Sequence, residues 1–218
     1  MDPTAWAGVY REGRDLFTRN GEPGRRLYGE LLRTAGGIEY RQWDPFRSKL
    51  SALLARGAPN DLLDPVGAAL YLGAAHGTTA SHLSDLWRES QIFLVEKSPS
   101  SFAPLLALAR RRSNLLPILA DAQLPERYRA ELPEVEFLYQ DVAQRDQARI
   151  FVDNARTVLA PGGRGILMLK VRSVTQRRPS ASVVREARGE LVRGGLKVTS
   201  ETSLAPFSRD HVALLVRR

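Results

Sequence analysis

The chain has 218 residues, of which 32 are basic and 24 acidic, so its formal net charge is +8 at pH 7. This length allows one sizeable hydrophobic core with a small appendage, and the positive charge favours a polyanionic partner over an acidic metabolite. The chain contains no cysteine, which excludes disulfides, a thiolate zinc site and a thiol nucleophile and points to the cytosol. No run of about 18 or more apolar residues is present, so we expect a soluble protein with no membrane partner.

The first 43 residues contain short alternating runs separated by turn-forming pairs. Asn20-Gly21, Pro23-Gly24 and Gly36-Gly37 predict hairpin turns. We therefore expect a small β-rich N-terminal subdomain over residues 1–43 and a larger domain over residues 44–218.

The larger domain is predicted to begin with a helix. Asp44-Pro45 is typical of an N-cap followed by a first-turn proline, and Gly57 of the position just after a helix. The helix between them carries apolar residues at helical spacing (Leu50, Leu53 and Leu54), and Lys49 lies on it.

The next element is an apolar strand over residues 68–72, a turn from Gly73 to Gly77 that includes Ala74, and a helix that begins near Thr78 and Thr79. Such a unit directs the free N–H groups of its helix at the turn, where an anionic group binds favourably. The second glycine of a dinucleotide fingerprint is Ala75 here, and its Cβ would crowd a pyrophosphate. A ligand with only a carboxylate, such as S-adenosylmethionine, is the better match; a turn without a ligand is the alternative.

The rest of the chain alternates strands with helices. Strands are predicted over residues 91–96, 115–119, 135–139 and 165–171, with helices over residues 98–112, 150–159 and 182–192. Two final strands, around residues 196–203 and 212–216, have no helix between them. The pattern predicts a Rossmann-like α/β fold with a seven-stranded, mostly parallel sheet and an antiparallel edge.

Charged residues follow several of these strands. Ligands of such sheets bind beyond the carboxyl ends of the strands, where Glu96, Asp121, Asp141 and Lys170 lie. Glu96 has the spacing from the turn expected of a carboxylate that binds both ribose hydroxyls, and Asp121 is placed to accept from an adenine amino group. Each carboxylate alone is also consistent with a solvated loop or a helix cap, but their order favours a nucleoside cofactor.

Two absences narrow the acceptor of a methyl group. Without cysteine, methylation at carbon 5 of pyrimidines has no nucleophile. The sequence after the fourth strand, Asp141-Val142-Ala143-Gln144, lacks the Pro-Pro-aromatic pattern of enzymes that methylate exocyclic amines. An oxygen acceptor remains, and a ribose hydroxyl needs a base to remove its proton, for which Lys49 and Lys170 are candidates.

Five segments of the chain carry a family pattern: residues 37–50, 71–85, 118–122, 139–148 and 210–212. The most specific are Gly-Thr-Thr-Ala-Ser-His over residues 77–82 and Tyr-Gln-Asp-Val-Ala-Gln over residues 139–144. Together they resemble fibrillarin in its compact archaeal form, which lacks a Gly/Arg-rich tail.

The resemblance implies a class I S-adenosylmethionine-dependent methyltransferase that carries out guide-RNA-directed 2′-O-methylation of pre-rRNA and tRNA. Its implied partners are box C/D guide RNA, a Nop-domain scaffold protein and a kink-turn-binding ribosomal-type protein.

The resemblance also implies site residues, with no metal among them. By position, the family's catalytic set falls on Lys49, Asp141, Lys170 and His211, with Lys170 as the base. The implied cofactor contacts are Gly73, Ala74, Ala75, Gly77, Thr78, Thr79, Glu96, Lys97, Asp121, Ala122, Asp141, Val142, Ala143 and Gln144. Lys97 replaces the aromatic residue usual in relatives, so only its aliphatic stem is available to cover the adenine.

Two other classes of function stay open at this point. A small-molecule O-methyltransferase would share the cofactor half, but would more often use a metal or histidine base and a lid over a closed pocket. A non-catalytic RNA-binding subunit would explain the basic charge, but not the series of acidic residues at successive strand ends.

Overall fold

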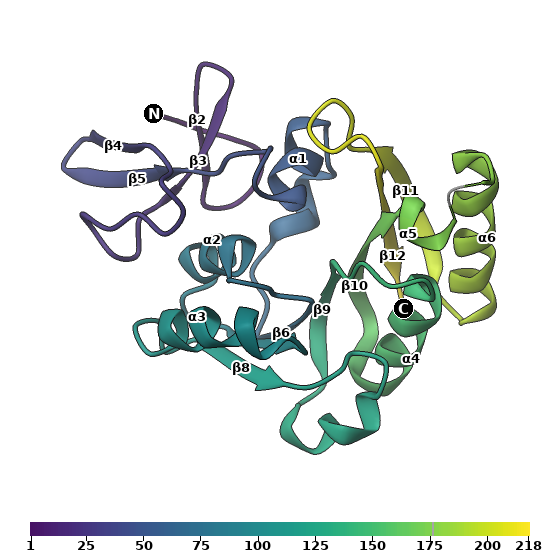
Figure 1. Ribbon diagram of the computed structural model, residues 1–218. Helices are drawn as coiled ribbons and strands as arrows, with labels where there is room; N and C mark the ends of the chain where they lie inside the picture. The colour runs from purple at the N-terminus through teal and green to yellow at the C-terminus, as the bar shows by residue number, and fades with distance from the viewer. Residues whose placement is uncertain (176) are drawn as a thin grey trace.

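The structure is a computed structural model that describes residues 1–175 and 177–218 (Figure 1). Its larger part is a seven-stranded sheet in the order β11-β12-β10-β9-β6-β7-β8. The strands are β6 (Ala68–Leu72), β7 (Gln91–Glu96), β8 (Leu115–Leu119), β9 (Val135–Gln140), β10 (Leu159–Lys170), β11 (Lys197–Ser203) and β12 (His211–Arg217). Strands β6 to β10 are parallel, and β12 is antiparallel to both of its neighbours. The predicted fold class, with its antiparallel edge, is confirmed.

Helices cover both faces of this sheet because its central strands are apolar on both sides. The helices are α1 (Lys49–Ala55), α2 (Thr78–Leu86), α3 (Pro99–Ala109), α4 (Gln147–Val158), α5 (Val171–Val174) and α6 (Ser180–Arg193), with 3-10 turns η1 (Asn60–Leu63), η2 (Pro125–Arg127) and η3 (Arg129–Glu131). On β6, Tyr71 packs in the cluster formed with α1, α2 and α3, whereas Leu70 and Leu72 pack in the cluster formed with α4 and α6. In the described part of the chain no helix is long and apolar enough to cross a membrane.

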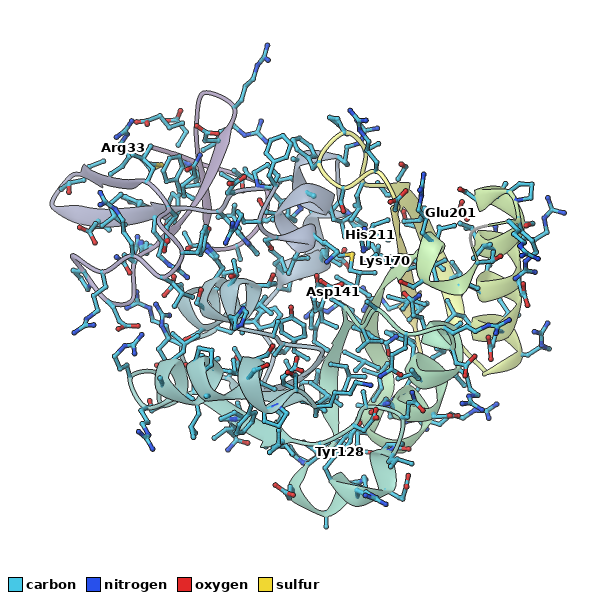
Figure 2. All side chains as sticks on the ribbon, in the orientation of Figure 1. Arg33, Tyr128, Asp141, Lys170, Glu201 and His211 are labelled. Carbon is cyan, nitrogen blue, oxygen red and sulfur yellow. The ribbon has the colours of Figure 1, made fainter. Side chains whose placement is uncertain are left out.

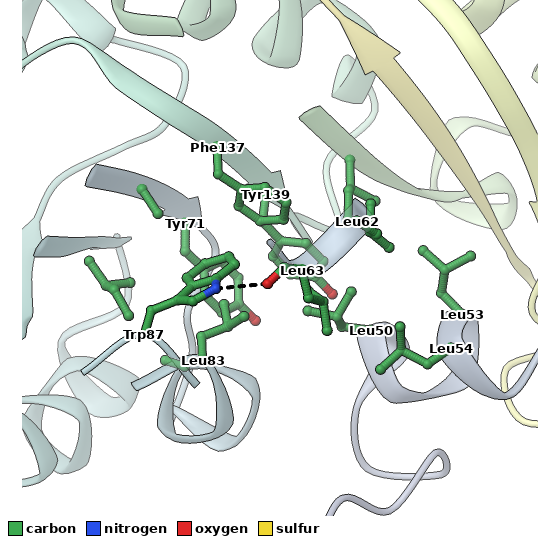
Figure 3. Close-up of a cluster of buried hydrophobic side chains, with 14 of the residues drawn as sticks. Leu50, Leu53, Leu54, Leu62, Leu63, Tyr71, Leu83, Trp87, Phe137 and Tyr139 are labelled. Carbon is green, nitrogen blue, oxygen red and sulfur yellow. Dashed lines mark hydrogen bonds between the residues drawn. The ribbon is translucent and has the colours of Figure 1, made fainter. Parts of the chain in front are cut away.

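The first of these clusters fixes α1 against the sheet (Figure 3). Leu50, Leu53 and Leu54 of α1 are at most 1% exposed. The indole N–H of Trp87 donates to the carbonyl of Leu63 across 3.1 Å, which ties the end of α2 to η1. Burial of the three leucines, worth about 1.5–3 kcal/mol each, positions the first residue of α1, Lys49, at the edge of the sheet.

The start of α1 differs from the prediction. Ser48, not Asp44, is the N-cap, and α1 begins at Lys49. The Asp44 carboxylate accepts the N–H of Phe46 across 2.8 Å and so caps a separate turn. Asp44-Pro45 is therefore a turn signal here, while Gly57 follows the helix as expected, with φ +93°.

The N-terminal sheet has five antiparallel strands in the order β1-β2-β3-β5-β4. They are β1 (Asp2–Pro3), β2 (Val9–Glu12), β3 (Asp15–Arg19), β4 (Leu32–Ala35) and β5 (Ile38–Gln42). Gly36 and Gly37 form the predicted hairpin turn, both with positive φ.

Two of the predicted hairpin turns are wrong. Asn20-Gly21 and Pro23-Gly24 lie in one long loop between β3 and β4, and the second hairpin turn is instead at Gly13. The loop is held by side chains rather than by strand pairing, since the Glu39 carboxylate accepts from the Asn20 amide and from the Gly24 N–H. This long-range partner has no local sequence signal.

Buried polar contacts join the small sheet to α2. Arg41 of β5 forms ion pairs with Glu30, at 2.8 Å, and with Asp85 of α2, at 2.5 Å. His82 of α2 is fully buried, and its ring nitrogens lie 2.8 Å from the hydroxyls of Thr18 and Tyr28. Burial and the neighbouring arginines lower the pKa of His82 well below its usual value. The imidazole is therefore neutral and serves as a packing and hydrogen-bonding group.

Candidate active site

The loop after β6 adopts a left-handed backbone at three positions. Gly73, Ala75 and Gly77 have φ values of +80°, +47° and +87°. A Cβ at Gly73 would lie 2.6 Å from the carbonyl oxygen of Asp141, so only glycine lets these two strand ends approach. Ala75 takes the conformation without being glycine, and its N–H donates to the Glu96 carboxylate across 2.9 Å. This contact fixes the turn that the sequence indicated as an anion-binding loop.

The first turn of α2 is tied to α1. Gly77 is the N-cap of α2 and has no side chain to accept a hydrogen bond. The N–H groups of the first turn therefore have no side-chain cap. The hydroxyl of Thr79 lies 2.9 Å from that of Ser48, the N-cap of α1. Thr79 therefore already has a protein partner, whereas the Thr78 side chain is only partly buried.

A first cavity of about 280 Å³ lies beyond the ends of β6, β7, β8 and β9. Its lining contains most of the residues expected to contact a cofactor: Gly73, Ala75, Glu96, Lys97, Ala122, Asp141, Val142, Ala143 and Gln144. Val95 and Ala120 line it as well and were not expected.

Glu96, an acidic group of this cavity, is held by two backbone N–H groups. One carboxylate oxygen accepts the N–H of Ser98 across 2.8 Å, and the other accepts the N–H of Ala75 across 2.9 Å. Each carboxylate oxygen keeps a further lone pair. Glu96 is therefore held in one orientation and can still accept from two hydroxyls of a ligand.

Asp121 and Gly77 do not line either of the cavities found at this edge. One Asp121 oxygen accepts the N–H of Gln123 across 3.0 Å, and the other lies 3.7 Å from the ammonium of Lys97. Gly77 is needed for close packing of the turn, because a Cβ there would lie 2.6 Å from the side chain of Leu108. The contact of Asp121 with adenine stays a prediction.

A second cavity of about 300 Å³ adjoins the first and shares part of its lining with it. Lys49, Asp141, Lys170 and His211, the four residues expected to be catalytic, all line it, and Figure 2 shows Asp141, Lys170 and His211 close together. The other lining residues are Arg47, Tyr71, Gly73, Ala74, Ala75, His76, Thr78, Thr79 and Ala143. The structure thus brings together side chains from α1, β9, β10 and β12.

Lys49 and Asp141 form an ion pair at this cavity. The ammonium nitrogen lies 2.6 Å from the Asp141 carboxylate. Burial raises the pKa of Asp141 above its usual value, and the charges of Lys49 and Lys170 offset part of this rise. Removal of either lysine is therefore expected to favour the protonated carboxyl.

The end of β10 is fixed by the side chain of Gln147. The pairing of β9 with β10 ends at Gln140, opposite Leu167, three residues short of Lys170. In place of a strand, the Gln147 amide accepts the N–H of Lys170 across 2.8 Å and donates to its carbonyl across 3.1 Å. Gln147 is 0% exposed, so the side-chain end of this clamp is buried. No sequence pattern indicated this role.

His211 reaches the same edge because β12 is antiparallel. It is the first residue of β12 and lies opposite Lys170, the last residue of β10. Its Nδ1 lies 2.8 Å from the hydroxyl of Ser208. Burial and the charges of Lys49 and Lys170 lower the pKa of His211 to about 4. The ring is therefore neutral at neutral pH.

Sequence reasoning missed Val95 and Ala120 in the first cavity, Arg47, Tyr71 and His76 in the second, and Ser48 as a support. Arg47 and Ser48 lie in the same segment as Lys49, so their closeness along the chain was an available signal. Tyr71 and His76 gave none, because a tyrosine in an apolar strand and a histidine in a turn are both ordinary.

The two cavities together suit S-adenosylmethionine. Their combined size falls in the range of small-ligand pockets, Glu96 presents acceptors for a ribose, and the first turn of α2 offers N–H donors to a carboxylate. The described residues contain no group of three or more metal-ligating side chains.

The sheet order, the glycine-bounded turn and the cavity at the strand ends define the fold of class I S-adenosylmethionine-dependent methyltransferases. An O-methyltransferase from Bacillus cereus solved with SAH shares this fold, with a TM-score of 0.60 at 16% identity. The model of the fibrillarin family matches residues 3–218, so the chain belongs to the fibrillarin family.

Curated relatives and solved structures agree with this membership. The fibrillarin-like rRNA/tRNA 2′-O-methyltransferase of Methanothermobacter thermautotrophicus is 39% identical over 211 residues, which cover 97% of this chain and 94% of the relative. That of Thermococcus gammatolerans is 43% identical, covering 93% and 90%. The structure is similar to Aeropyrum pernix fibrillarin with natively bound S-adenosyl-L-methionine, with a TM-score of 0.90, 38% identity and coverage of 99% and 96%. A chain of a fibrillarin/Nop5p complex has a TM-score of 0.88, 36% identity and coverage of 98% of both chains.

Proposed function

We propose that this chain is an S-adenosylmethionine-dependent 2′-O-methyltransferase that acts on rRNA and tRNA. The observation that carries the proposal is the second cavity, at which Lys49, Asp141, Lys170 and His211 meet, next to the first cavity, which Glu96 lines. The names of the curated relatives support the same reaction.

Most of the proposed cofactor contacts lie in the first cavity. Glu96 accepts from the ribose hydroxyls, because its carboxylate is already oriented by two backbone donors. Thr78 and the first turn of α2 bind the carboxylate, and Asp121 accepts from the adenine amino group after a side-chain rotation. The stem of Lys97 covers part of the adenine, and residues 142–144 together with Ala122 line its other side.

The cofactor supplies an already activated methyl group. The protein's task is therefore to align the 2′-oxygen of a ribose and to accept its proton. Lys170 accepts that proton on its amine, and His211 and Asp141 hold the amine in place. Lys49 lowers the proton affinity of Lys170 through its like charge, and its ion pair keeps Asp141 ionised.

The proposal extends to the assembly. The similarity to the chain solved in a fibrillarin/Nop5p complex supports a Nop-domain scaffold as partner. A box C/D guide RNA then selects the nucleotide, and a kink-turn-binding protein holds that RNA. We also propose that residues 1–43 form a subdomain distinct from the methyltransferase domain over residues 44–218.

Titration calorimetry of the purified chain with S-adenosylmethionine tests the cofactor assignment. Glu96→Gln should weaken binding about 10- to 100-fold, because one backbone N–H then faces an amide donor. Glu89→Gln, at an exposed position, is the matched control and should bind normally. Asp121→Ala should weaken binding by roughly 1–3 kcal/mol. No heat of binding to the folded wild-type chain at millimolar cofactor would reject the function.

A reconstituted complex tests the reaction. With scaffold, kink-turn protein and guide RNA, the chain should methylate one guide-specified 2′-hydroxyl, and alone it should methylate RNA poorly and without site preference. Efficient site-specific methylation by the chain alone would contradict the proposed assembly.

A further inference from the structure

An exposed phenylalanine packs on a partly buried one near the second cavity, which Lys49, Asp141, Lys170 and His211 line and which we call the catalytic cavity. Phe46, in the loop before α1, is 68% exposed, the highest value among the large apolar residues in the described part of the chain. Its ring centroid is 5.2 Å from that of Phe207, with the rings 74° apart. Phe207 lies in the loop between β11 and β12, which approaches α1 in Figure 1. We call these two residues the aromatic pair.

Both loops of the aromatic pair lead directly into the catalytic cavity. Phe46 precedes Lys49 by three residues, and Phe207 precedes His211 by four. Ser208, next to Phe207, contacts the His211 ring, and Arg47, next to Phe46, lines the cavity. Neither ring lines the cavity itself, but each directly precedes a segment that does, so the aromatic pair lies on the surface next to the cavity.

The core does not account for the position of Phe46. The buried face of α1 is formed by its leucines, which are at most 1% exposed, and Phe46 contributes little to it. The exposed ring of Phe46 is followed directly by Arg47, and aromatic side chains combined with basic ones are a feature of surfaces that bind nucleic acid.

The shape of RNA indicates which part of it would contact the aromatic pair. An A-form duplex displays its 2′-hydroxyls in a wide, shallow minor groove, with apolar faces of the sugars beside them. If the target 2′-hydroxyl enters the cavity from such a duplex, the surface around the cavity faces the minor groove. The ring of Phe46, supported edge-on by Phe207, is the feature of this surface suited to enter it.

We propose that the aromatic pair packs into the minor groove of the guide–substrate RNA duplex, against sugars next to the target ribose. This inference rests on the proposed function. Packing against sugars is independent of base identity, so it leaves the choice of nucleotide to the guide. Arg47 binds a flanking phosphate, and the pair limits how deeply the target ribose enters the cavity.

Tryptophan fluorescence tests the proposal directly, because Trp6, Trp43 and Trp87 are all at most 7% exposed. In Phe46→Trp, we expect acrylamide to quench the new indole in the reconstituted protein complex that holds guide RNA but no substrate strand. Addition of the substrate strand should protect it. Val192→Trp, at a position that is 55% exposed on α6, is the matched control and should stay quenchable throughout.

Single-turnover kinetics supply the second readout. Phe46→Ala should raise the half-saturating substrate RNA concentration about 10-fold, which corresponds to about 1.4 kcal/mol, with cofactor affinity unchanged. Phe46→Tyr should restore most of the loss, and Val192→Ala should have no effect.

The outcomes separate this inference from the proposed function. Methylation by the wild type together with an indole that the substrate strand does not protect would overturn the inference alone. Protection by the scaffold protein before any RNA is added would assign the aromatic pair to a protein interface and also overturn it. A folded wild-type complex that binds cofactor and duplex but transfers no methyl group would instead reject the proposed function.

Discussion

The clamp that Gln147 forms on Lys170 predicts a large effect for Gln147→Leu. Leucine has a similar volume but neither accepts the Lys170 N–H nor donates to its carbonyl, which are bonded across 2.8 Å and 3.1 Å. Because Gln147 is 0% exposed, the side-chain end of both bonds is buried. An unsatisfied buried group costs about 1–3 kcal/mol, so loss of both bonds should lower the free energy of unfolding by about 2–6 kcal/mol.

The same change should affect catalysis more than cofactor binding. Lys170 ends β10 where β9 no longer supports it, so loss of the clamp lets its amine move, and a displacement of about 1 Å costs about 10²-fold in rate. Urea unfolding and single-turnover methylation measure the two effects. Gln91→Leu, at an exposed position at the start of β7, is the control. A Gln147→Leu free energy of unfolding within 0.5 kcal/mol of the wild type, on the scale of ordinary surface changes, would refute the clamp.

Three further predictions concern the site and its support. Lys170→Arg keeps the charge but has no neutral form, so single-turnover methylation should fall about 10²–10⁴-fold with cofactor affinity unchanged. Lys197→Arg, at an exposed position, is the control and should keep the wild-type rate. A normal rate for Lys170→Arg would reduce Lys170 to a positioning residue. The pKa of His211 is about 4 in the folded chain against 6.5 in the unfolded chain. Between these values the unfolded chain binds more protons than the folded chain, so the free energy of unfolding decreases as the pH falls. His211→Asn should therefore lose less stability between pH 7 and pH 5 than the wild type in urea unfolding, and equal losses would contradict the assignment. Arg41→Met leaves the buried Asp85 with one cationic partner fewer and should destabilise the chain by about 3–5 kcal/mol, whereas an unchanged thermal midpoint would show that the ion pair contributes nothing.

Local patterns were sufficient to predict the larger sheet. The apolar runs that became β7 and β8 had the same bounds in sequence and structure, because buried strands are continuous apolar segments between clear turn signals. The N-terminal sheet was harder, since its long loop is held by Glu39, a partner distant in sequence. Asp44 and Ser48 are both good capping residues, and tertiary packing decided between them.

The candidate site was predictable in part for a similar reason. Residues that directly follow strands meet at one edge of a parallel sheet, and this rule indicated Glu96, Asp141 and Lys170. His211 came from the family resemblance, and its register opposite Lys170 needed the strand order. The role of Gln147 was out of reach, because it depends on β9 ending three residues short of Lys170.

The ion pairs of Arg41 have a consequence for how the molecule would respond to a partner. One of them, Arg41–Asp85, crosses from the small sheet to α2, the helix whose first turn lines the second cavity. The small sheet and α2 therefore share one set of buried charges, and separating them would leave Asp85 of α2 with Arg112 as its remaining ion-pair partner. A protein bound to the small sheet would stabilise α2 by mass action, and the cofactor would in turn tighten the binding of that protein.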